Sequence, residues 1–188
     1  MRIIAGEFGG RVLQAPHGRA TRPTSDRVRE ALFSILGDIS NLDALDLYAG
    51  SGGLGFEALS RGAASATFVD EARGALAAIR HNAEKLGVGA RARVLAGDVS
   101  KVMGRLAREK RRFGLVFLDP PYELHGVPRV LKALGDSPLV LPWSAVVYEH
   151  SVRTDPMDEF EGLLRQSTRV YGDTGLTFYE KQPTMEDA

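Results

Sequence analysis

Hydrophobic and polar positions alternate along most of the chain in short blocks that predict strands and helices in turn. Apolar runs predict strands at about 44–48, 66–69, 93–96, 115–118 and 145–149. Between them, apolar residues recur at helical spacing and predict helices at about 54–61, 72–86, 99–110 and 127–134. Repeated strand–helix–strand units form a parallel sheet with helices on both faces. The pattern therefore predicts a doubly wound α/β fold.

The N-terminal region precedes this alternation and predicts an arm followed by a helix. Residues 1–20 have the pattern of a small β-hairpin arm with its turn at Gly9-Gly10. Thr24 or Ser25 is suited to cap a helix that runs to Leu36, because apolar residues recur at helical spacing behind it and a glycine follows.

The C-terminal region predicts a second hairpin. Residues 168–171 and 176–180 are strand-like, and the turn residues Gly172 to Gly175 separate them. We expect this hairpin to add an antiparallel edge strand to the mostly parallel sheet. No linker or internal repeat interrupts the chain, so we expect a single domain over residues 1–188, made of the arm 1–20, a core 21–181 and a frayed polar tail 182–188.

Composition narrows the class of protein. The 188 residues are 44% hydrophobic and 26% charged, which is typical of a globular domain. No apolar run approaches the roughly 20 residues needed to span a bilayer, and the N-terminus lacks a signal-peptide pattern, so we expect a cytoplasmic protein. The absence of cysteine excludes disulfides and a thiolate nucleophile. The four histidines lack ligand spacing, so we expect no metal site.

Charge is balanced overall, with a formal net charge of +0, but the basic residues are clustered. One cluster lies in the first 30 residues and another lies between residues 105 and 112. Basic patches on a neutral protein can dock phosphates locally, although a charge cluster is also an ordinary solvated face. Arg27 and Arg29 either point at a ligand or pair with Glu30 and Asp26. The candidate RNA-binding residues are Arg2, Arg11, Arg22, Arg27 and Arg29.

Residues 44–55 join a buried strand to a helix through a glycine-rich turn. Its glycines allow the backbone to approach a ligand closely, and the helix that follows presents free N–H groups. The spacing Gly50-x-Gly52-x-x-Gly55, with Asp70 20 residues after Gly50, also satisfies the dinucleotide fingerprint. A dehydrogenase is therefore open at this point.

Four successive strands each end near an acid, namely Asp46, Asp70, Asp98 and Asp119. Ligands of doubly wound folds bind beyond the carboxyl ends of the strands, so one rim is expected to carry all four carboxylates. Asp70 is placed to accept from the hydroxyls of a ribose, or to cap the helix 72–86. Asp98 is suited to accept from an adenine amine while Val99 packs on the ring, or to cap its own helix. Asp46 could orient loop amides or face a cationic group.

Asp119-Pro120-Pro121-Tyr122 is the most specific motif. Two consecutive prolines fix φ and remove two N–H donors, so the turn is rigid and presents the Asp119 carboxylate and the Pro120 carbonyl as acceptors. A base amino group is a poor nucleophile because its lone pair is delocalised. Two acceptors that bind its hydrogens can hold it and aim the lone pair at an electrophile. Tyr122 can stack on the base.

At these residues the sequence resembles the Rossmann-like S-adenosylmethionine-dependent methyltransferases. Asp46-x-Tyr48-Ala49-Gly50-Ser51-Gly52 is similar to their first motif, and Asp119-Pro120-Pro121-Tyr122 is similar to the motif of enzymes that methylate exocyclic amines. The segments 22–33, 54–63 and 171–174 more closely resemble the bacterial 16S rRNA guanine-N2 methyltransferase family (RsmD type). This resemblance runs from about residue 2 to residue 181.

The resemblance implies a seven-stranded sheet with the last strand antiparallel, S-adenosyl-L-methionine as cofactor, and one guanine of 16S rRNA in the assembling small subunit as substrate. By position, the first-motif loop would hold the methionine part, Asp70 the ribose, Asp98 the adenine, and Asp119 to Tyr122 the target amine. Glu71 departs from the family pattern and receives no cofactor role. Residues 123–142 match no family motif.

Three other functions stay open. A dehydrogenase would bind NAD but would have no use for the Asp-Pro-Pro-Tyr motif. Methylation of adenine in DNA uses a similar tetrapeptide. A noncatalytic assembly factor would need the basic arm but not the acids at the strand ends. We expect a monomer that meets 16S rRNA in a ribonucleoprotein particle and has no membrane partner.

Overall fold

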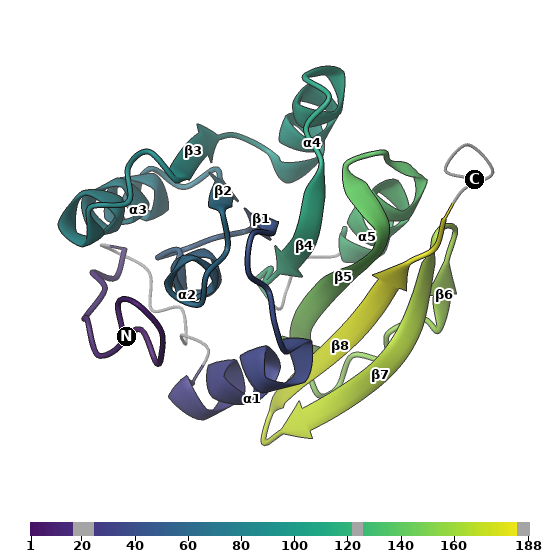
Figure 1. Cartoon of the computed structure of the whole chain (residues 1–188). Coiled ribbons are helices and arrows are strands. Elements are labelled where there is room, and N and C mark those ends of the chain that lie inside the picture. Colours follow the sequence, from purple (N-terminus) through teal and green to yellow (C-terminus); the bar gives the residue numbers. More distant parts are fainter. Residues whose placement is uncertain (17–24, 122–125, 184–188) are drawn as a thin grey trace.

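A computed structural model describes residues 1–16, 25–121 and 126–183. The described residues form one eight-stranded sheet in the order β3-β2-β1-β4-β5-β8-β7-β6 (Figure 1). The strands are β1 (Asp43–Leu47), β2 (Ser65–Asp70), β3 (Ala92–Ala96), β4 (Phe113–Leu118), β5 (Val140–Ser151), β6 (Glu159–Phe160), β7 (Leu163–Tyr171) and β8 (Thr174–Lys181). The helices are α1 (Asp26–Leu36), α2 (Gly53–Ser60), α3 (Arg73–Leu86), α4 (Val99–Arg108) and α5 (Val127–Asp136).

The sheet is parallel from β3 to β5 and antiparallel beyond it. β1 pairs in parallel with β2 and β4, and β5 pairs in parallel with β4 and antiparallel with β8. The predicted Rossmann-like architecture, with a mostly parallel sheet and a C-terminal antiparallel strand, is confirmed. Because parallel neighbours point the same way, the carboxyl ends of β1 to β4 meet at one rim of the sheet.

The structure corrects two details of the predicted sheet. The last strand is not at the edge, because β8 lies between β5 and β7 and pairs with both. Its residues 175–179 are buried, whereas much of β7 is exposed, so the apolar strand occupies the inner position. The sheet also has eight strands rather than seven, since the two-residue β6 pairs with β7. β5 begins at Val140, five residues before the predicted start at 145.

Each face of the sheet has its own hydrophobic core. On one face, side chains of α1, α2 and α3 such as Phe33, Phe56 and Ile79 pack together with Phe117 of the sheet. On the other, α4 and α5 pack against the sheet through residues such as Leu106 and Leu131. Successive residues of a strand therefore face different cores, which decides where each polar side chain at the rim points.

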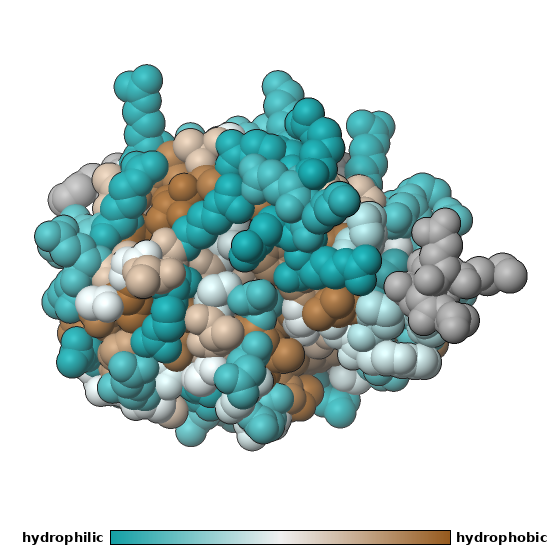
Figure 2. Space-filling view, turned by 45° about the horizontal axis from the view of Figure 1, so that its top comes forward, coloured by the Kyte–Doolittle hydropathy of each residue, from teal (hydrophilic) through white to brown (hydrophobic). Residues whose placement is uncertain are grey.

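The N-terminal arm is antiparallel but forms a single β-bridge, between Arg2 and Val12, instead of two strands. Ile3, Phe8 and Leu13 are buried in the core shared with α1 and α2. Packing of these side chains therefore helps to hold the arm on the domain. On the face seen in Figure 2, hydrophilic side chains project over much of the surface and hydrophobic residues show in patches between them.

The predicted helices lie where the apolar spacing placed them, with ends that shift by one or two residues. Ser25 caps α1, and its side chain accepts a hydrogen bond from the Val28 N–H at 3.3 Å. Thr24, the other candidate cap, and residues 184–188 of the predicted tail lie outside the described residues. In the described ranges no helix is both long and apolar enough to cross a membrane.

Candidate active site

The glycine-rich turn between β1 and α2 has an unusual backbone. Tyr48, Gly50 and Gly52 all have positive φ, at 63°, 56° and 80°. This conformation is unfavourable for an aromatic residue, so the surroundings of Tyr48 must enforce it. A Cβ at Gly50 would meet no atom within 4 Å, whereas a Cβ at Gly52 would lie 2.6 Å from the Phe56 ring. The turn is therefore packed at Gly52 and open at Gly50.

Asp46 lies beneath this turn. Its side chain is buried, and its Oδ2 accepts a hydrogen bond from the Gly55 N–H in the first turn of α2 at 2.9 Å. Burial raises the pKa of Asp46 to about 8, and the nearby Asp70 carboxylate adds to the rise, while the Gly55 hydrogen bond opposes it. Asp46 thus fixes the start of α2 relative to β1, one of the two roles expected for it.

Asp70 closes the other side of the turn. Its Oδ2 accepts from the Gly50 N–H at 2.9 Å and its Oδ1 accepts from the Ala72 N–H at 2.8 Å. The side chain is half-buried at the end of β2. Asp70 therefore connects the glycine turn to Ala72, the residue before α3. The alternative role considered for it, capping this helix, is not seen, because the N-cap of α3 is Ala72 and no side chain caps the helix.

Asp98 caps α4, accepting a hydrogen bond from the Lys101 N–H at 3.0 Å, and Val99 begins the helix as a buried residue. The alternative capping role considered for Asp98 is therefore present, and contact with an adenine stays a prediction. The Tyr48 hydroxyl interacts electrostatically with Asp98. Burial raises the pKa of Tyr48 to about 12, with further contributions from Asp98, Glu71 and Tyr148. The Tyr48 hydroxyl is therefore within electrostatic range of acids that follow β2 and β3.

The Asp-Pro-Pro corner follows β4 directly. The Asp119 N–H donates to the Leu47 carbonyl at 3.4 Å, so the corner begins beside the strand that leads into the glycine turn. Asp119 is half-buried, Pro120 is buried and Pro121 is exposed. Tyr122, the predicted stacking residue, lies outside the described residues. The structure thus brings the corner and the glycine turn to adjacent strand ends of one rim.

Sequence reasoning missed two polar residues of β5 at this corner. Glu149 and His150 are buried and line a small cavity together with Pro120, Pro121 and Tyr148. A carbonyl can only accept, so the contact of 2.8 Å from His150 Nδ1 to the Ser151 oxygen places the proton on Nδ1. Burial lowers the pKa of His150, which favours the neutral ring. The rule that selected acids at strand ends could have found Glu149, because it closes the apolar run of a predicted strand.

Asn82 of α3 was also missed, and it joins the arm to the glycine turn. Its Nδ2 donates to the carbonyls of Gln14 and Ser51 at 3.0 and 3.1 Å, and its Oδ1 accepts from the Gln14 N–H at 2.8 Å. The side chain is fully buried. No sequence pattern indicated that Asn82 is buried, since an Asn within an amphipathic helix usually lies on the polar face.

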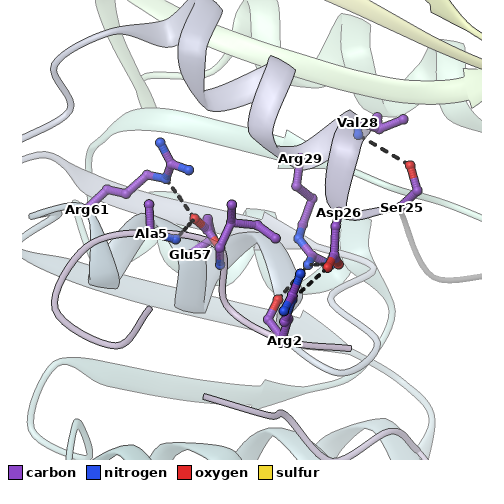
Figure 3. Close-up of polar contacts among 9 residues, drawn as sticks. Arg2, Ala5, Ser25, Asp26, Val28, Arg29, Glu57 and Arg61 are labelled. Atoms are coloured by element: carbon purple, nitrogen blue, oxygen red, sulfur yellow. Dashed lines mark hydrogen bonds and ion pairs between the residues drawn. The ribbon is translucent and has the colours of Figure 1, made fainter. Parts of the chain in front are cut away.

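The structure corrects the interpretation of Arg29 as an RNA-contacting residue. Its side chain is only 1% exposed, and its Nη2 donates to the Arg2 carbonyl at 2.6 Å and to Asp26 Oδ1 at 2.9 Å. Figure 3 shows Arg29 pointing from α1 toward Arg2 and Asp26. Burial lowers the pKa of Arg29, and the carboxylates of Asp26, Glu57 and Glu149 oppose this. The guanidinium therefore holds α1 on the arm.

Among the other predicted arginines, the three that the structure describes are exposed. Arg2 is exposed and pairs with Asp26 at 3.0 Å. Arg11 is exposed, and its guanidinium lies 5.5 Å from the centre of the Phe8 ring. Arg27 is exposed on α1. Arg22 lies outside the described residues.

The arm that carries two of these arginines is fastened to α2. Glu57 is fully buried and accepts hydrogen bonds from the N–H groups of Ile4 and Ala5 at 2.7 and 3.1 Å. It also pairs with Arg61 at 2.7 Å, and Figure 3 shows Glu57 between Ala5 and Arg61. A Cβ at Gly53 would lie 2.8 Å from the Met1 side chain, so the first residue of the arm packs against the end of the glycine turn.

Comparison with known proteins decides the family. The model of the family described as "Conserved hypothetical protein 95" matches residues 1–180. The chain belongs to this family. A curated relative, ribosomal RNA small subunit methyltransferase D of Escherichia coli, is 37% identical over 187 residues, which cover 99% of this chain and 92% of the relative.

Solved structures agree with the assignment of the chain to this family. The Escherichia coli protein yhhF is 32% identical, has a TM-score of 0.82, and the match covers 98% of this chain and 99% of yhhF. An RNA methyltransferase from Salinibacter ruber, solved with S-adenosyl-L-homocysteine, matches at 18% identity with a TM-score of 0.65, covering 87% of this chain and 95% of that one. This more distant match shows a shared fold. The Rossmann-like methyltransferase fold expected from the sequence resemblance is thus confirmed.

Proposed function

We propose that the chain transfers a methyl group from S-adenosyl-L-methionine to the exocyclic N2 of a guanine in 16S rRNA of the assembling small ribosomal subunit. The observation that carries the proposal is the rigid corner Asp119-Pro120-Pro121, which begins beside Leu47 at the foot of the glycine turn. The family relative named for small-subunit rRNA methylation supports the choice of RNA. A monomer acting on a ribonucleoprotein particle in the cytoplasm is part of the proposal.

The residues around the glycine turn fit the cofactor. Gly50 has a positive φ and open space beside it, so ligand atoms can approach the backbone where a side chain would block them. The structural neighbour that binds S-adenosyl-L-homocysteine has the same fold, which supports this choice of cofactor. Tyr48, Ala49, Gly50, Ser51 and Gly52 would hold the methionine part, Asp46 would orient the turn, Asp70 would bind the ribose, and Asp98 with Val99 would bind the adenine.

The chain's own groups supply positioning. S-adenosyl-L-methionine, when bound, provides a methyl group activated by its sulfonium, whose sulfur retains the electron pair of the broken bond. Asp119 and the Pro120 carbonyl accept hydrogens of the guanine amine, which orients its lone pair. Asp119, directly or through water, takes the proton that the amine releases. Pro121 keeps the corner rigid.

The target base must leave its stack to reach this corner. The guanine amine lies on the minor-groove edge, so the base has to be splayed from a loop or flipped into the site. Tyr122 is proposed to stack on it. Arg2, Arg11, Arg22 and Arg27 are proposed to contact the RNA backbone around the site.

Asp119→Ala tests the proposal. With labelled S-adenosyl-L-methionine, the wild-type protein should label guanine N2 in 16S rRNA, offered either naked or in small-subunit particles. Asp119→Ala should lose roughly 100-fold or more in transfer rate while it still binds the cofactor, because the lost group acts on the amine. Full turnover by the variant would remove Asp119 from catalysis. Label on adenine in DNA would favour the alternative substrate, and bound NAD without transfer would favour a dehydrogenase.

A further inference from the structure

Glu149 is a buried carboxylate at the corner that the proposed function leaves without a role. It is 4% exposed and lies near the carboxyl end of β5. In the parallel pairing of β4 with β5, Leu118 lies opposite Tyr148. Asp119 and Glu149 are the next residues along the two strands. They are therefore lateral neighbours, and adjacent strands lie about 4.8 Å apart.

Both acids also belong to the same face of the sheet. Phe117 and Val147 are opposite each other and pack in the core formed with α1 and α2. Tyr148 packs in the other core. Side chains two residues apart on a strand point to the same face. Glu149 therefore points to the same face as Val147, and Asp119 to the same face as Phe117, which is the face covered by α1 and α2.

Glu149 is also one of the residues that line the small cavity beside the corner, together with Pro120 and Pro121. The residue is therefore next to the corner that carries the acceptors proposed to hold the amine. The guanidinium of Arg29, 1% exposed, interacts electrostatically with Glu149 from the α1 side. An ionised carboxylate only accepts hydrogen bonds.

We propose that Glu149 determines specificity for guanine by accepting the N1–H of the target base. This inference rests on the proposed function, in which Asp119 and Pro120 hold the neighbouring N2. Guanine carries a hydrogen on N1, so its edge offers donors to both groups. In adenine and in 2-aminopurine N1 is an acceptor, and a carboxylate facing it would be repelled. Glu149 would thus reject bases that carry an amine but lack the adjacent N–H.

The test compares RNA substrates that differ only at the target base, guanine or 2-aminopurine, because both carry the N2 amine. The wild-type protein should prefer guanine in kcat/KM by on the order of 100-fold. Glu149→Gln should lower kcat/KM for guanine and raise it for 2-aminopurine, since an amide N–H can donate to N1, so the preference should fall at least about tenfold. Glu159→Gln, at an exposed position of β6, is the matched control and should leave the preference unchanged.

Two further readouts separate specificity from a structural role. Cofactor binding should be the same in Glu149→Gln and wild type, and Glu149→Asp, which keeps the charge, should keep the preference at a lower rate. An equal loss on both bases, or an unchanged preference, in Glu149→Gln would overturn the inference. If that variant does not fold, equal wild-type activity on both bases overturns it. Absence of wild-type activity on guanine would instead overturn the proposed function, and this inference with it.

Discussion

Asp46 shows how a single buried acid can couple the fold to the ligand site. Its carboxyl group is enclosed between β1 and α2, and burial raises its pKa to about 8. In the ligand-free protein it therefore carries a proton through most of the neutral range. A cationic group placed near it would lower that pKa and favour the ionised form. Asp46 can thus serve both roles considered from the sequence, orienting the turn and responding to a charged ligand.

Asp46→Asn should remove a pH dependence of stability. The folded pKa of about 8 exceeds the ordinary value of 3.8, so the folded state binds the proton more tightly than the unfolded state. The resulting stabilisation is present below about pH 4 and is lost as the pH rises toward 8. Between these limits the free energy of unfolding of the wild type should fall, relative to Asp46→Asn, by up to about 1.4 kcal/mol per pH unit.

Denaturant unfolding at pH 5, 6, 7 and 8 checks this expectation. The difference between wild type and Asp46→Asn is the informative quantity, because it cancels the other titrating groups. Glu84→Gln, on the exposed side of α3, removes a carboxylate without changing the interior and should give a flat difference. Parallel curves for wild type and Asp46→Asn would show that Asp46 ionises normally in the fold.

At the level of elements, the sequence predicted the parts whose signals are local. Apolar runs and glycines located the strand ends. For this reason the sequence could predict that four acids lie at or near one rim of the sheet, namely Asp46, Asp70, Asp98 and Asp119. Their roles toward a ligand stay predictions. The position of β8 inside the sheet was missed, because strand order depends on packing between distant segments. Its buried run 175–179 carried the relevant signal.

The burial of Arg29 and Asn82 could not be predicted for a related reason. Spacing on a helix separates an apolar face from a polar one, but it does not reveal that another segment covers the polar face. The arm covers both residues, and its carbonyl groups accept their hydrogen bonds. The contacts are separated by 27 and 68 positions in the chain, so no local pattern could report them.

Asn82→Ala should weaken cofactor binding as well as stability. The variant removes hydrogen bonds to Gln14 of the arm and Ser51 of the turn and leaves half-buried backbone groups without these partners. We expect a loss of about 2 to 4 kcal/mol in the free energy of unfolding and a severalfold higher Kd for S-adenosyl-L-methionine. His81→Ala, an adjacent exposed position of α3, should change neither. A destabilised Asn82→Ala with unchanged Kd would mean that the turn keeps its form without this link.

At the level of the whole molecule, the arm and the rim form one continuous region. Met1 packs near Gly53, Asn82 joins the arm to Ser51, and Glu57 fastens the arm to α2. An RNA that contacts the exposed arginines of the arm and α1 would therefore lie beside the glycine turn. In the proposed function, this arrangement would let backbone contacts position the RNA while the corner after β4 binds the target amine.

Arg27 and Arg29, both on α1, allow a proposed RNA-contacting arginine to be compared with a structural one. Arg27→Ala removes an exposed charge, so it should weaken binding of a 16S rRNA fragment. The slope of log Kd against log salt should fall by about 1, which corresponds to the loss of one phosphate contact. The free energy of unfolding should stay within about 0.5 kcal/mol of wild type. Arg29→Ala leaves the Arg2 carbonyl without its partner and removes one of the two ion pairs of Asp26, so it should cost about 2 kcal/mol of stability. Where Arg29→Ala stays folded, its salt slope should match the wild type. A reduced slope for Arg29→Ala with no loss of stability would reverse the correction and return this residue to RNA contact.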